Sequence, residues 1–397
     1  MRLIHLAVAA AMTLALASTA TASPVLVLNR GHVSHENDPF LAPVSALPSA
    51  PAGARAAAHP RARVSQAAVR TTLAALLSSG QISQRAYDAR IADYNDALGI
   101  RHALAGTRRH ELSVVIDQLN AFAAAGQLIP SRLNVLWLQL RRNAEWWSHG
   151  TLLGANERVR FKGSRVIFQY FPGQGLQFHP LANWGRAEAL INHGYYPNVR
   201  AFMKELIPLA AKRGSSIAWE YYFYFGGGAP PWTSGLSQGT ALITLARAYR
   251  QFNSAHYLGV ARRALSLYQL SPPTGVRVKT RRGAYYVEYS FYRRYRVING
   301  FIQALIGLYD FAQATNDPTA RALFRAGDRE ARHELPSYDT GRWSRYDNTG
   351  VLSRLNYHVL LRDFLRQICA RTHTRIYCSK AARFTRDLRR GPPKGVG

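Results

Sequence analysis

Aromatic hydroxyls beside acidic or basic side chains recur in the C-terminal half of this 397-residue chain. The pairs are Glu288–Tyr289, Tyr338–Asp339, Tyr346–Asp347 and Tyr357–His358. A phenol, a carboxyl group and an imidazole can each give or take a proton when they lie beside the reacting atom. The pattern therefore indicates proton-transfer chemistry. It does not choose among the residues, because a chain with 21 tyrosines buries many of them.

A tyrosine that acts as a base needs help from its surroundings. Its ordinary pKa is near 10, so presenting the phenolate at neutral pH costs about 4 kcal/mol, at about 1.36 kcal/mol per pKa unit. Nearby cations would have to supply most of that free energy. Arg354, three residues before Tyr357, is the first candidate, and Arg293, Arg294 and Arg345 are further ones. Arginine can both lower a phenol's pKa and hold a carboxylate with two hydrogen bonds.

The order of these motifs closely resembles the C-terminal catalytic domain of the D-glucuronyl C5-epimerases. The resemblance spans residues 215–368 and extends, less clearly, back to a hairpin pattern at 165–180. The matching segments are Trp232-Thr233-Ser234 with Gln238-Gly239, Glu288-Tyr289, Ile298-Asn299-Gly300-Phe301, Tyr338-Asp339, Tyr346-Asp347 and Arg354-x-x-Tyr357-His358. Any single segment is weak, but this many in the family's order are hard to obtain by chance.

The resemblance implies an isomerase that inverts C5 of D-glucuronate residues in an acidic polysaccharide. That reaction removes a proton from a carbon next to a carboxylate and returns one from the opposite face. The site must also place positive charge or hydrogen-bond donors at the carboxylate, where the carbanion's charge flows. By resemblance, the catalytic residues are Glu288, Tyr289, Tyr346 and Tyr357, and the substrate-binding residues are Arg354, Arg294, Trp232, Gln238, Tyr338 and His358.

The chain departs from vertebrate members of that family in three ways. Asn348-Thr349 follows the second Tyr–Asp step, where those members have Leu-Arg, and Ser290–Arg294 replaces a proline-bearing stretch. The helical pattern at 64–150 differs from their β-rich region. The sequence therefore leaves open which residue grips the substrate carboxylate and which uronate polymer is recognised.

Three other functions fit parts of the pattern. A polysaccharide lyase removes the same C5 proton but expels the 4-O substituent. A non-catalytic protein would bind acidic glycan with its arginines and with Trp146, Trp147 and Trp232. Gly235-x-Ser237-x-Gly239 matches the serine-hydrolase motif, but that motif follows a strand directly, and Pro230-Pro231 intervenes here.

The chain is strongly basic. Its formal net charge of +29 comes from 51 lysine and arginine residues against 22 acidic ones. Such a field attracts polyanions. Nucleic acid is the weaker candidate, because the chain has an export signal and lacks winged-helix, zinc-finger and RNA-binding signatures. We therefore expect an anionic uronate-containing polysaccharide as the partner.

The N-terminus has the pattern of a secretory signal. Arg2 is followed by an apolar run from Leu6 to Ala17 and by small residues ending at Ala22, as in segments that direct export. We expect a secreted, extracellular protein, with this segment either cleaved or kept as an anchor. No later segment has the roughly 20 uncharged apolar residues of a spanning helix, so no transmembrane domain is expected.

The elements that must position the site are mainly helical. Apolar positions repeat at helical spacing over 64–150 and again after residue 235, with strand patterns at 166–170, 176–178 and 216–225. Successive helices joined by loops rich in aromatics and arginines predict an α/α toroid, an incomplete (α/α) barrel with short β-hairpins. The expected divisions are a signal peptide at 1–22, a disordered Ala/Pro-rich linker at 23–62, a helical module at 63–155, the catalytic domain at 156–378 and a basic tail at 379–397.

The two cysteines, Cys369 and Cys378, are expected to form a disulfide, because the export signal places them in an oxidising compartment. The histidines lack metal-binding spacing, and Gly226-Gly227-Gly228 lacks the Lys and Ser/Thr of a phosphate loop. No metal or cofactor is therefore predicted, although a structural calcium held by carbonyls and scattered carboxylates would leave no readable motif. The sequence does not decide between a monomer and a homodimer.

Overall fold

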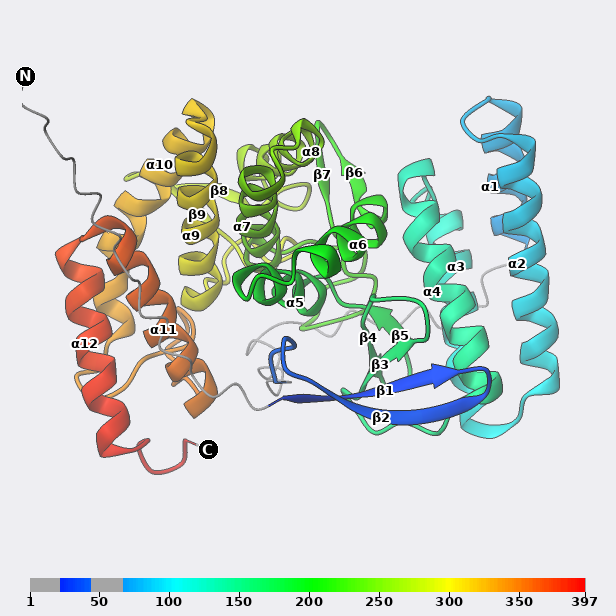
Figure 1. Ribbon diagram of the computed structural model, residues 1–397, viewed down its shortest axis with the longest axis horizontal. Helices are drawn as coiled ribbons and strands as arrows, with labels where there is room; N and C mark the ends of the chain where they lie inside the picture. The colour runs from blue at the N-terminus through cyan, green and yellow to red at the C-terminus, as the bar shows by residue number, and fades with distance from the viewer. Residues whose placement is uncertain (1–21, 44–66, 397) are drawn as a thin grey trace, which may run out of the picture.

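The computed structural model describes residues 22–43 and 67–396. Its strands are β1 (Ser23–Asn29), β2 (His32–Asp38), β3 (Arg158–Phe161), β4 (Phe168–Phe171), β5 (Gly175–Phe178), β6 (Ala211–Arg213), β7 (Ser216–Ala218), β8 (Arg277–Lys279) and β9 (Ala284–Tyr286). Its helices are α1 (Ala67–Ser78), α2 (Gln84–Ala103), α3 (Gly106–Ala124), α4 (Pro130–His149), α5 (Pro180–Asn192), α6 (Tyr196–Leu206), α7 (Gly235–Phe252), α8 (Ala255–Leu265), α9 (Ile298–Thr315), α10 (Pro318–Glu334), α11 (Leu355–Thr372) and α12 (Arg375–Arg390). The prediction of a mainly α fold with short hairpins is confirmed (Figure 1).

Helices α5 to α12 form consecutive hairpins in two layers. Helices α5, α7, α9 and α11 pack side by side in that order, and α6, α8, α10 and α12 each pack against the helix before them. Figure 1 shows this row crossing the molecule. Where α7 meets α9, a side chain on Gly307 would collide with the carbonyl of Gly239. Glycine at this contact therefore lets the two helix backbones touch.

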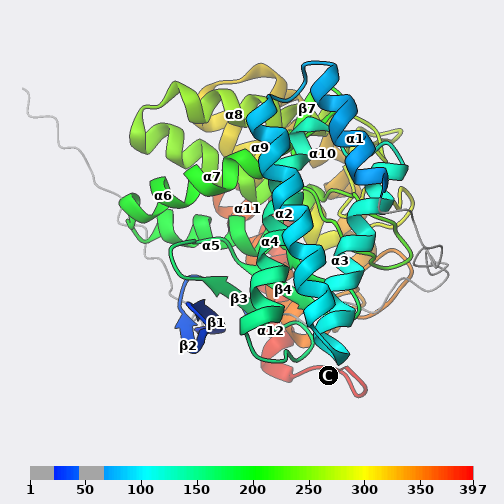
Figure 2. The same cartoon turned by 90° about the vertical axis from the view of Figure 1, so that its right-hand side faces the viewer.

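The helices predicted over 64–150 are α1 to α4, which lie together at one end of the molecule (Figure 2). Their buried apolar residues belong to the same hydrophobic core as those of β3, β4 and α5 to α12. Helix α4 also fixes β5, because Asn143 Oδ1 accepts a hydrogen bond from Leu176 N at 2.8 Å. The expected module thus shares its core with the rest of the chain and supports the sheet beneath the site.

The five-stranded sheet has the order β2-β1-β3-β4-β5, with β1 parallel to β3 and the other neighbours antiparallel. The β4–β5 hairpin lies where the sequence predicted one. The linker predicted over 23–62 is wrong for residues 23–38, which form the β1–β2 hairpin. The apolar run Val25–Leu28 is buried, and Arg30 and Gly31, at φ 47° and 84°, form the tight turn that matches strand twist. Residues 44–62 of that linker lie outside the described residues.

The basic tail predicted over 379–397 is also wrong for most of its length. Helix α12 extends to Arg390 and packs against α11, and its Tyr377 and Phe384 side chains are fully buried. A disulfide joins Cys369 to Cys378 across the turn between the two helices. The basic residues of α12 alternate with this apolar face, which a count of charge alone does not reveal.

The predicted export signal over 1–22 lies, except for its last residue, outside the described residues. Within the described part of the chain, no helix has the length and apolar character needed to cross a bilayer. In the same part, no group of three or more His, Cys, Asp or Glu side chains is placed to hold a metal ion.

Candidate active site

Segments distant in the sequence enclose a cavity of about 340 Å³. Its walls come from β3, β4, α5, α7, α9, α11 and the loops that contain residues 221–234 and 288–289. Four residues that the sequence singled out line it: Trp232, Glu288, Tyr289 and Tyr357. The predicted strand at 216–225 is shorter than expected, because β7 ends at Ala218 and the chain then turns to place Tyr221, Phe223 and Phe225 in the cavity wall.

Glu288, Tyr289 and Tyr346 form a group of interacting side chains. Tyr289 acts to lower the pKa of the Glu288 carboxyl, and Tyr346 acts to lower that of the Tyr289 hydroxyl, each as a hydrogen-bond donor does. All three side chains are buried. This proximity allows a proton to move between Tyr289 and the Glu288 carboxylate.

Burial controls the ionisation of this group. It raises the pKa of Glu288 to about 7, and the hydrogen bond from Tyr289 only partly opposes that rise. Burial, followed by the charge of Glu288, also raises the pKa of Tyr289, Tyr346 and Tyr357. Arg354 does act to lower the pKa of Tyr357, as predicted, but by less than burial and the charge of Glu288 raise it. The group that changes charge near neutral pH is Glu288.

The two remaining phenols differ in their access to the cavity. Tyr357, in the first turn of α11, lines it. Tyr346 is only 4% exposed and packs behind Tyr357, with ring centroids 4.9 Å apart. Tyr346 is therefore placed to position Tyr289 rather than to touch a substrate.

Trp232 forms an aromatic wall of the cavity. Its ring stacks on Tyr221 at 4.1 Å with an interplanar angle of 6°, and its Nε1 donates to the carbonyl of Phe223 at 2.8 Å. Such a rigid apolar face suits the C–H side of a sugar ring. This position agrees with the substrate-binding role predicted for Trp232.

Gln238 and Tyr338 do not line the cavity, contrary to the substrate-binding role predicted for them. Gln238 Nε2 donates to the carbonyls of Ile217 and Ala264 at 2.9 and 3.2 Å, which ties α7 to β7 and α8. Tyr338 is buried, and its hydroxyl donates to the carbonyl of Arg296 at 3.2 Å. Both side chains hold loops and helices together.

His358 and the two predicted arginines also lie outside the cavity wall. The imidazole of His358 is buried and stacks on Trp343 at 3.7 Å. Arg354 is exposed at the N-cap of α11, close enough to Tyr357 to affect its pKa. Arg294 is exposed on the loop before α9. None of these three side chains lines the cavity.

The cation in the cavity wall is Arg158, which sequence reasoning missed. It is 7% exposed, its Nη1 donates to the carbonyl of Ala42, and its Nε lies 3.5 Å from Gln169 Oε1. Within the described residues, Arg158 Nη2 has no protein acceptor. Burial lowers the pKa of Arg158 to about 10, opposed by Asp38, so the side chain stays charged at neutral pH.

Strand alternation could have identified Arg158 from the sequence Arg158-Val159-Arg160-Phe161. Side chains alternate between the faces of a strand, and Val159 and Phe161 are both buried in the main core. The two arginines must then share the opposite face. That face turns toward the cavity.

His179 adds an uncharged donor to the cavity wall. Burial, reinforced by the charge of Arg158, lowers the pKa of His179 to about 3, so the ring is neutral. Its Nδ1 accepts a hydrogen bond from Ala182 N at 3.1 Å and caps α5. The ring proton therefore resides on Nε2, available to an acceptor in the cavity.

The serine of the hydrolase-like motif belongs to a helix. Ser237 lies in the first turn of α7, whose N-cap is Ser234, and its hydroxyl donates to the carbonyl of Ser234 at 3.4 Å. His358 on α11, the candidate base of such a triad, stacks on Trp343. The structure therefore gives no support to the hydrolase alternative.

Comparison with known proteins identifies the segment that supplies most of the predicted residues. Residues 213–386 match the family model described as "D-glucuronyl C5-epimerase C-terminus". This segment belongs to that family. The match contains Trp232, Glu288, Tyr289, Tyr346 and Tyr357, whereas Arg158 and His179 precede it.

Two curated proteins are similar to parts of the chain. The D-glucuronyl C5-epimerase of Caenorhabditis elegans is 37% identical over 151 residues, which are 33% of this chain and 24% of that protein. An uncharacterised protein of Methanocaldococcus jannaschii is 29% identical over 181 residues, 44% of this chain and 59% of its own length. The chain thus spans about a quarter of the length of the C. elegans protein and about three-fifths of the length of the M. jannaschii protein.

A solved structure of D-mannose isomerase aligns with 72% of this chain and 77% of its own, at 9% identity and a TM-score of 0.39. At that TM-score the likeness contributes nothing to the assignment of fold or function.

Proposed function

We propose that the protein is a carbohydrate epimerase that inverts C5 of D-glucuronate residues in an acidic polysaccharide. The observation that carries the proposal is the cavity itself, in which Tyr289 and Tyr357 lie with the Glu288 carboxylate and the Arg158 guanidinium. These are the groups that C5 inversion requires: two proton-transfer groups, a base, and a cation for the carboxylate.

The first step removes the C5 proton. The C5–H bond breaks, the proton moves to the oxygen of Tyr289, and the phenolic proton of Tyr289 moves to Glu288. The electron pair left on C5 spreads into the uronate carboxylate. Because the Tyr289 pKa is raised, this exchange avoids a free phenolate, and Glu288, with a pKa of about 7, is ionised in a large fraction of molecules at neutral pH.

The second step returns a proton from the other side of the ring. The hydroxyl proton of Tyr357 moves to C5, and the new C5–H bond gives the inverted centre. Glu288 is then protonated and Tyr357 is ionised. One proton must travel from Glu288 to Tyr357 to restore the site, and both side chains line the same cavity.

Arg158 and His179 would stabilise the intermediate. A guanidinium and a neutral Nε2–H aimed at the uronate carboxylate favour the form in which that group carries extra charge. Arg158 thus takes the role that the sequence assigned to Arg354 and Arg294. Gln169, within 3.5 Å of Arg158 Nε, would orient the guanidinium.

The same proposal includes an open α/α toroid and an extracellular location. The two-layered row α5 to α12 is consistent with an open α/α toroid whose loops surround the substrate, and an export signal would deliver the protein to extracellular polymers. The net charge of +29 would draw such polyanions to the cavity.

The test is incubation with several uronate polymers in heavy water, followed by nuclear magnetic resonance at C5. Deuterium at C5 together with the inverted epimer, in an unbroken chain, supports the proposal. A product with the ultraviolet absorbance of an unsaturated uronate identifies a lyase. Tight polymer binding without exchange on any polymer identifies a non-catalytic glycan-binding protein.

A further inference from the structure

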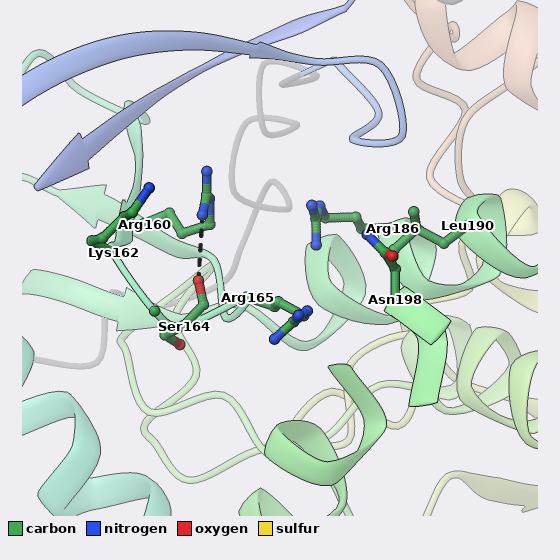
Figure 3. A pocket seen from close by; sticks show the side chains of 8 residues that line it. Arg160, Lys162, Ser164, Arg165, Arg186, Leu190 and Asn198 are labelled. Carbon is green, nitrogen blue, oxygen red and sulfur yellow. Dashed lines mark hydrogen bonds between the residues drawn. The ribbon is translucent and has the colours of Figure 1, made fainter. Parts of the chain in front are cut away.

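A second hollow, of about 390 Å³, lies at the end of β3. Four cationic side chains line it and no acidic one does: Arg160, Lys162, Arg165 and Arg186. Figure 3 shows the loop after β3 on one side and Arg186 with Asn198 on the other, with the guanidinium of Arg165 between them. Several fixed cations around a concave surface form a site for an oxyanion.

Each arginine of the hollow is paired with a carboxylate that does not line the hollow itself. The ion pairs are Arg160–Glu36, Arg186–Asp38 and Arg165–Glu205. The last of these is long, at 3.4 Å, with the Arg165 side chain 40% exposed. Lys162, exposed at the rim, forms no ion pair among the described residues, so four cations face three carboxylates.

Arg186 is a largely buried cation in the wall of the hollow. Its Nε donates to Asp38 Oδ2 at 2.6 Å, but its Nη1 is buried without a hydrogen-bond partner among the described residues. A buried donor without an acceptor costs about 1–3 kcal/mol, and more when it is charged. The guanidinium also lies over the Phe202 ring, 5.1 Å from its centroid, so Arg186 is a firmly packed positive charge in the wall of the hollow.

The hollow adjoins the cavity through two elements. On β3, Arg158 lines the cavity and Arg160 lines the hollow; two residues apart on one strand face, they are separated by about 6.6 Å of backbone. On α5, Gly185 lines the cavity and the next residue, Arg186, lines the hollow. A polymer with one sugar in the cavity would therefore place a neighbouring sugar over these cations.

Building on the proposed epimerase function, we propose that this hollow is a second anion subsite. It binds the carboxylate or sulfate group of a neighbouring sugar in the same polymer whose reacting uronate occupies the cavity. The subsite supplies binding energy remote from C5 and favours polymers with an anionic group on a nearby sugar over isolated uronates.

The test compares the double variant Lys162→Gln/Arg165→Gln with a control of equal charge, Arg281→Gln/Arg282→Gln, on the exposed β8–β9 turn. Each is assayed by C5 exchange on heparosan oligomers and on a methyl glucuronide, which has one anionic group. We expect the first variant to raise KM on the oligomers by about ten-fold, or about 1.4 kcal/mol, with kcat unchanged. Its KM on the glucuronide should match wild type, and the control should match wild type on both.

An equal rise in KM on the glucuronide, or an equal rise in the control, would overturn the subsite. Calorimetric titration of unsulfated heparosan and of sulfated heparin distinguishes the two anions, because the variant should lose affinity for whichever polymer the subsite prefers. The titration also separates the two proposals. If wild type shows no exchange, the epimerase proposal fails, and selective loss of polymer affinity in the first variant still decides whether the hollow binds anions.

Discussion

The carboxylate of Glu288 rests against Gly300 in the first turn of α9. A Cβ at position 300 would lie 2.5 Å from Glu288 Oε2 and 3.0 Å from Glu288 Cβ. The bare backbone at this position therefore lets the base approach the helix N-terminus, where the helix dipole favours negative charge. The glycine that the sequence marked only as part of a family motif has a direct role in placing Glu288.

Gly300→Ala should lower kcat strongly while changing the unfolding free energy little. The new methyl group displaces the Glu288 carboxylate from Tyr289, so we expect kcat to fall by about ten- to one-hundred-fold, since small displacements of a catalytic group are costly. The unfolding free energy should change by only about 1 kcal/mol, because alanine favours a helix by that amount. Gly259→Ala on α8, where a Cβ meets open space, is the matched control and should keep full activity. Equal activity of the two variants would contradict the role of Gly300.

Loss of the Tyr289 hydroxyl and loss of the Tyr357 hydroxyl, both of which line the cavity, should impair the reaction in different ways. Tyr357→Phe should abolish inversion while deuterium still enters C5 from the Tyr289 side with retained configuration, and Tyr289→Phe should lose both. Tyr346→Phe, which loses the hydrogen bond to Tyr289, should slow the reaction by about ten-fold, or about 1.4 kcal/mol. Nuclear magnetic resonance at C5 distinguishes deuterium exchange from inversion of configuration. Tyr292→Phe, in the same aromatic cluster but outside the cavity wall, is the control, and the two-sided mechanism is wrong if Tyr357→Phe still inverts C5.

Even the conservative replacement of Arg158 by lysine should lower kcat/KM strongly. Arg158→Lys keeps a positive charge but loses the planar donor fork, so we expect kcat/KM to fall by about one-hundred-fold, in the range for loss of one charge-stabilising donor. Arg158→Met should lose more. The control Arg141→Met removes an exposed charge on α4 and should have little effect. Retention of wild-type kcat/KM in Arg158→Lys would reassign the carboxylate clamp.

Glu288 should impose a pH dependence on catalysis. The carboxylate must be ionised to accept the proton from Tyr289, so kcat/KM should rise with pH through about 7. Glu288→Gln removes the base and should abolish this limb together with nearly all activity. A flat profile between pH 5 and 9 in the wild-type protein would exclude Glu288 as the base.

Glu288 should also make stability depend on pH, but in the opposite direction: stability should fall as pH rises, whereas kcat/KM rises. Its pKa is 4.5 ordinarily and about 7 when folded, so the folded state binds the extra proton and stability falls as pH rises between those values. At about 1.36 kcal/mol per pKa unit, the fall is about 3 kcal/mol. Glu288→Gln should therefore be more stable than wild type at pH 8, and the two should converge near pH 4, as measured by denaturant unfolding. Greater stability of wild type at pH 8 would show that Glu288 is not buried as described.

Local patterns were sufficient for part of this protein. Helical periodicity predicted α1 to α4 and the later helices, and the Pro172–Gly175 turn predicted the β4–β5 hairpin. The export context predicted the pairing of Cys369 with Cys378, which the structure joins. Ordered motifs selected Glu288, Tyr289 and Tyr357, because residues that serve one reaction keep their types and order along the chain.

Other features depended on contacts between segments far apart in the sequence. The strands before residue 39 were mistaken for linker because β1 is tied into the sheet by β3, where Leu26 lies opposite Val159, more than 130 residues later. Tyr338, Gln238 and His358 share the motifs' chemistry, yet they face packed interior, and only the packing of helices shows that. The ionisation of Glu288 and the phenols also follows from burial, which no local spacing encodes.

What the sequence determined by itself was the kind of chemistry available, because residue type sets whether a side chain can give or take a proton. What only the tertiary structure decided was which cation meets the proton-transfer groups. Arg158 comes from a strand 130 residues before Glu288, and the two share one cavity because the sheet that carries β3 packs beside the helical row. Among 51 basic residues, that placement in space distinguishes Arg158 from the rest.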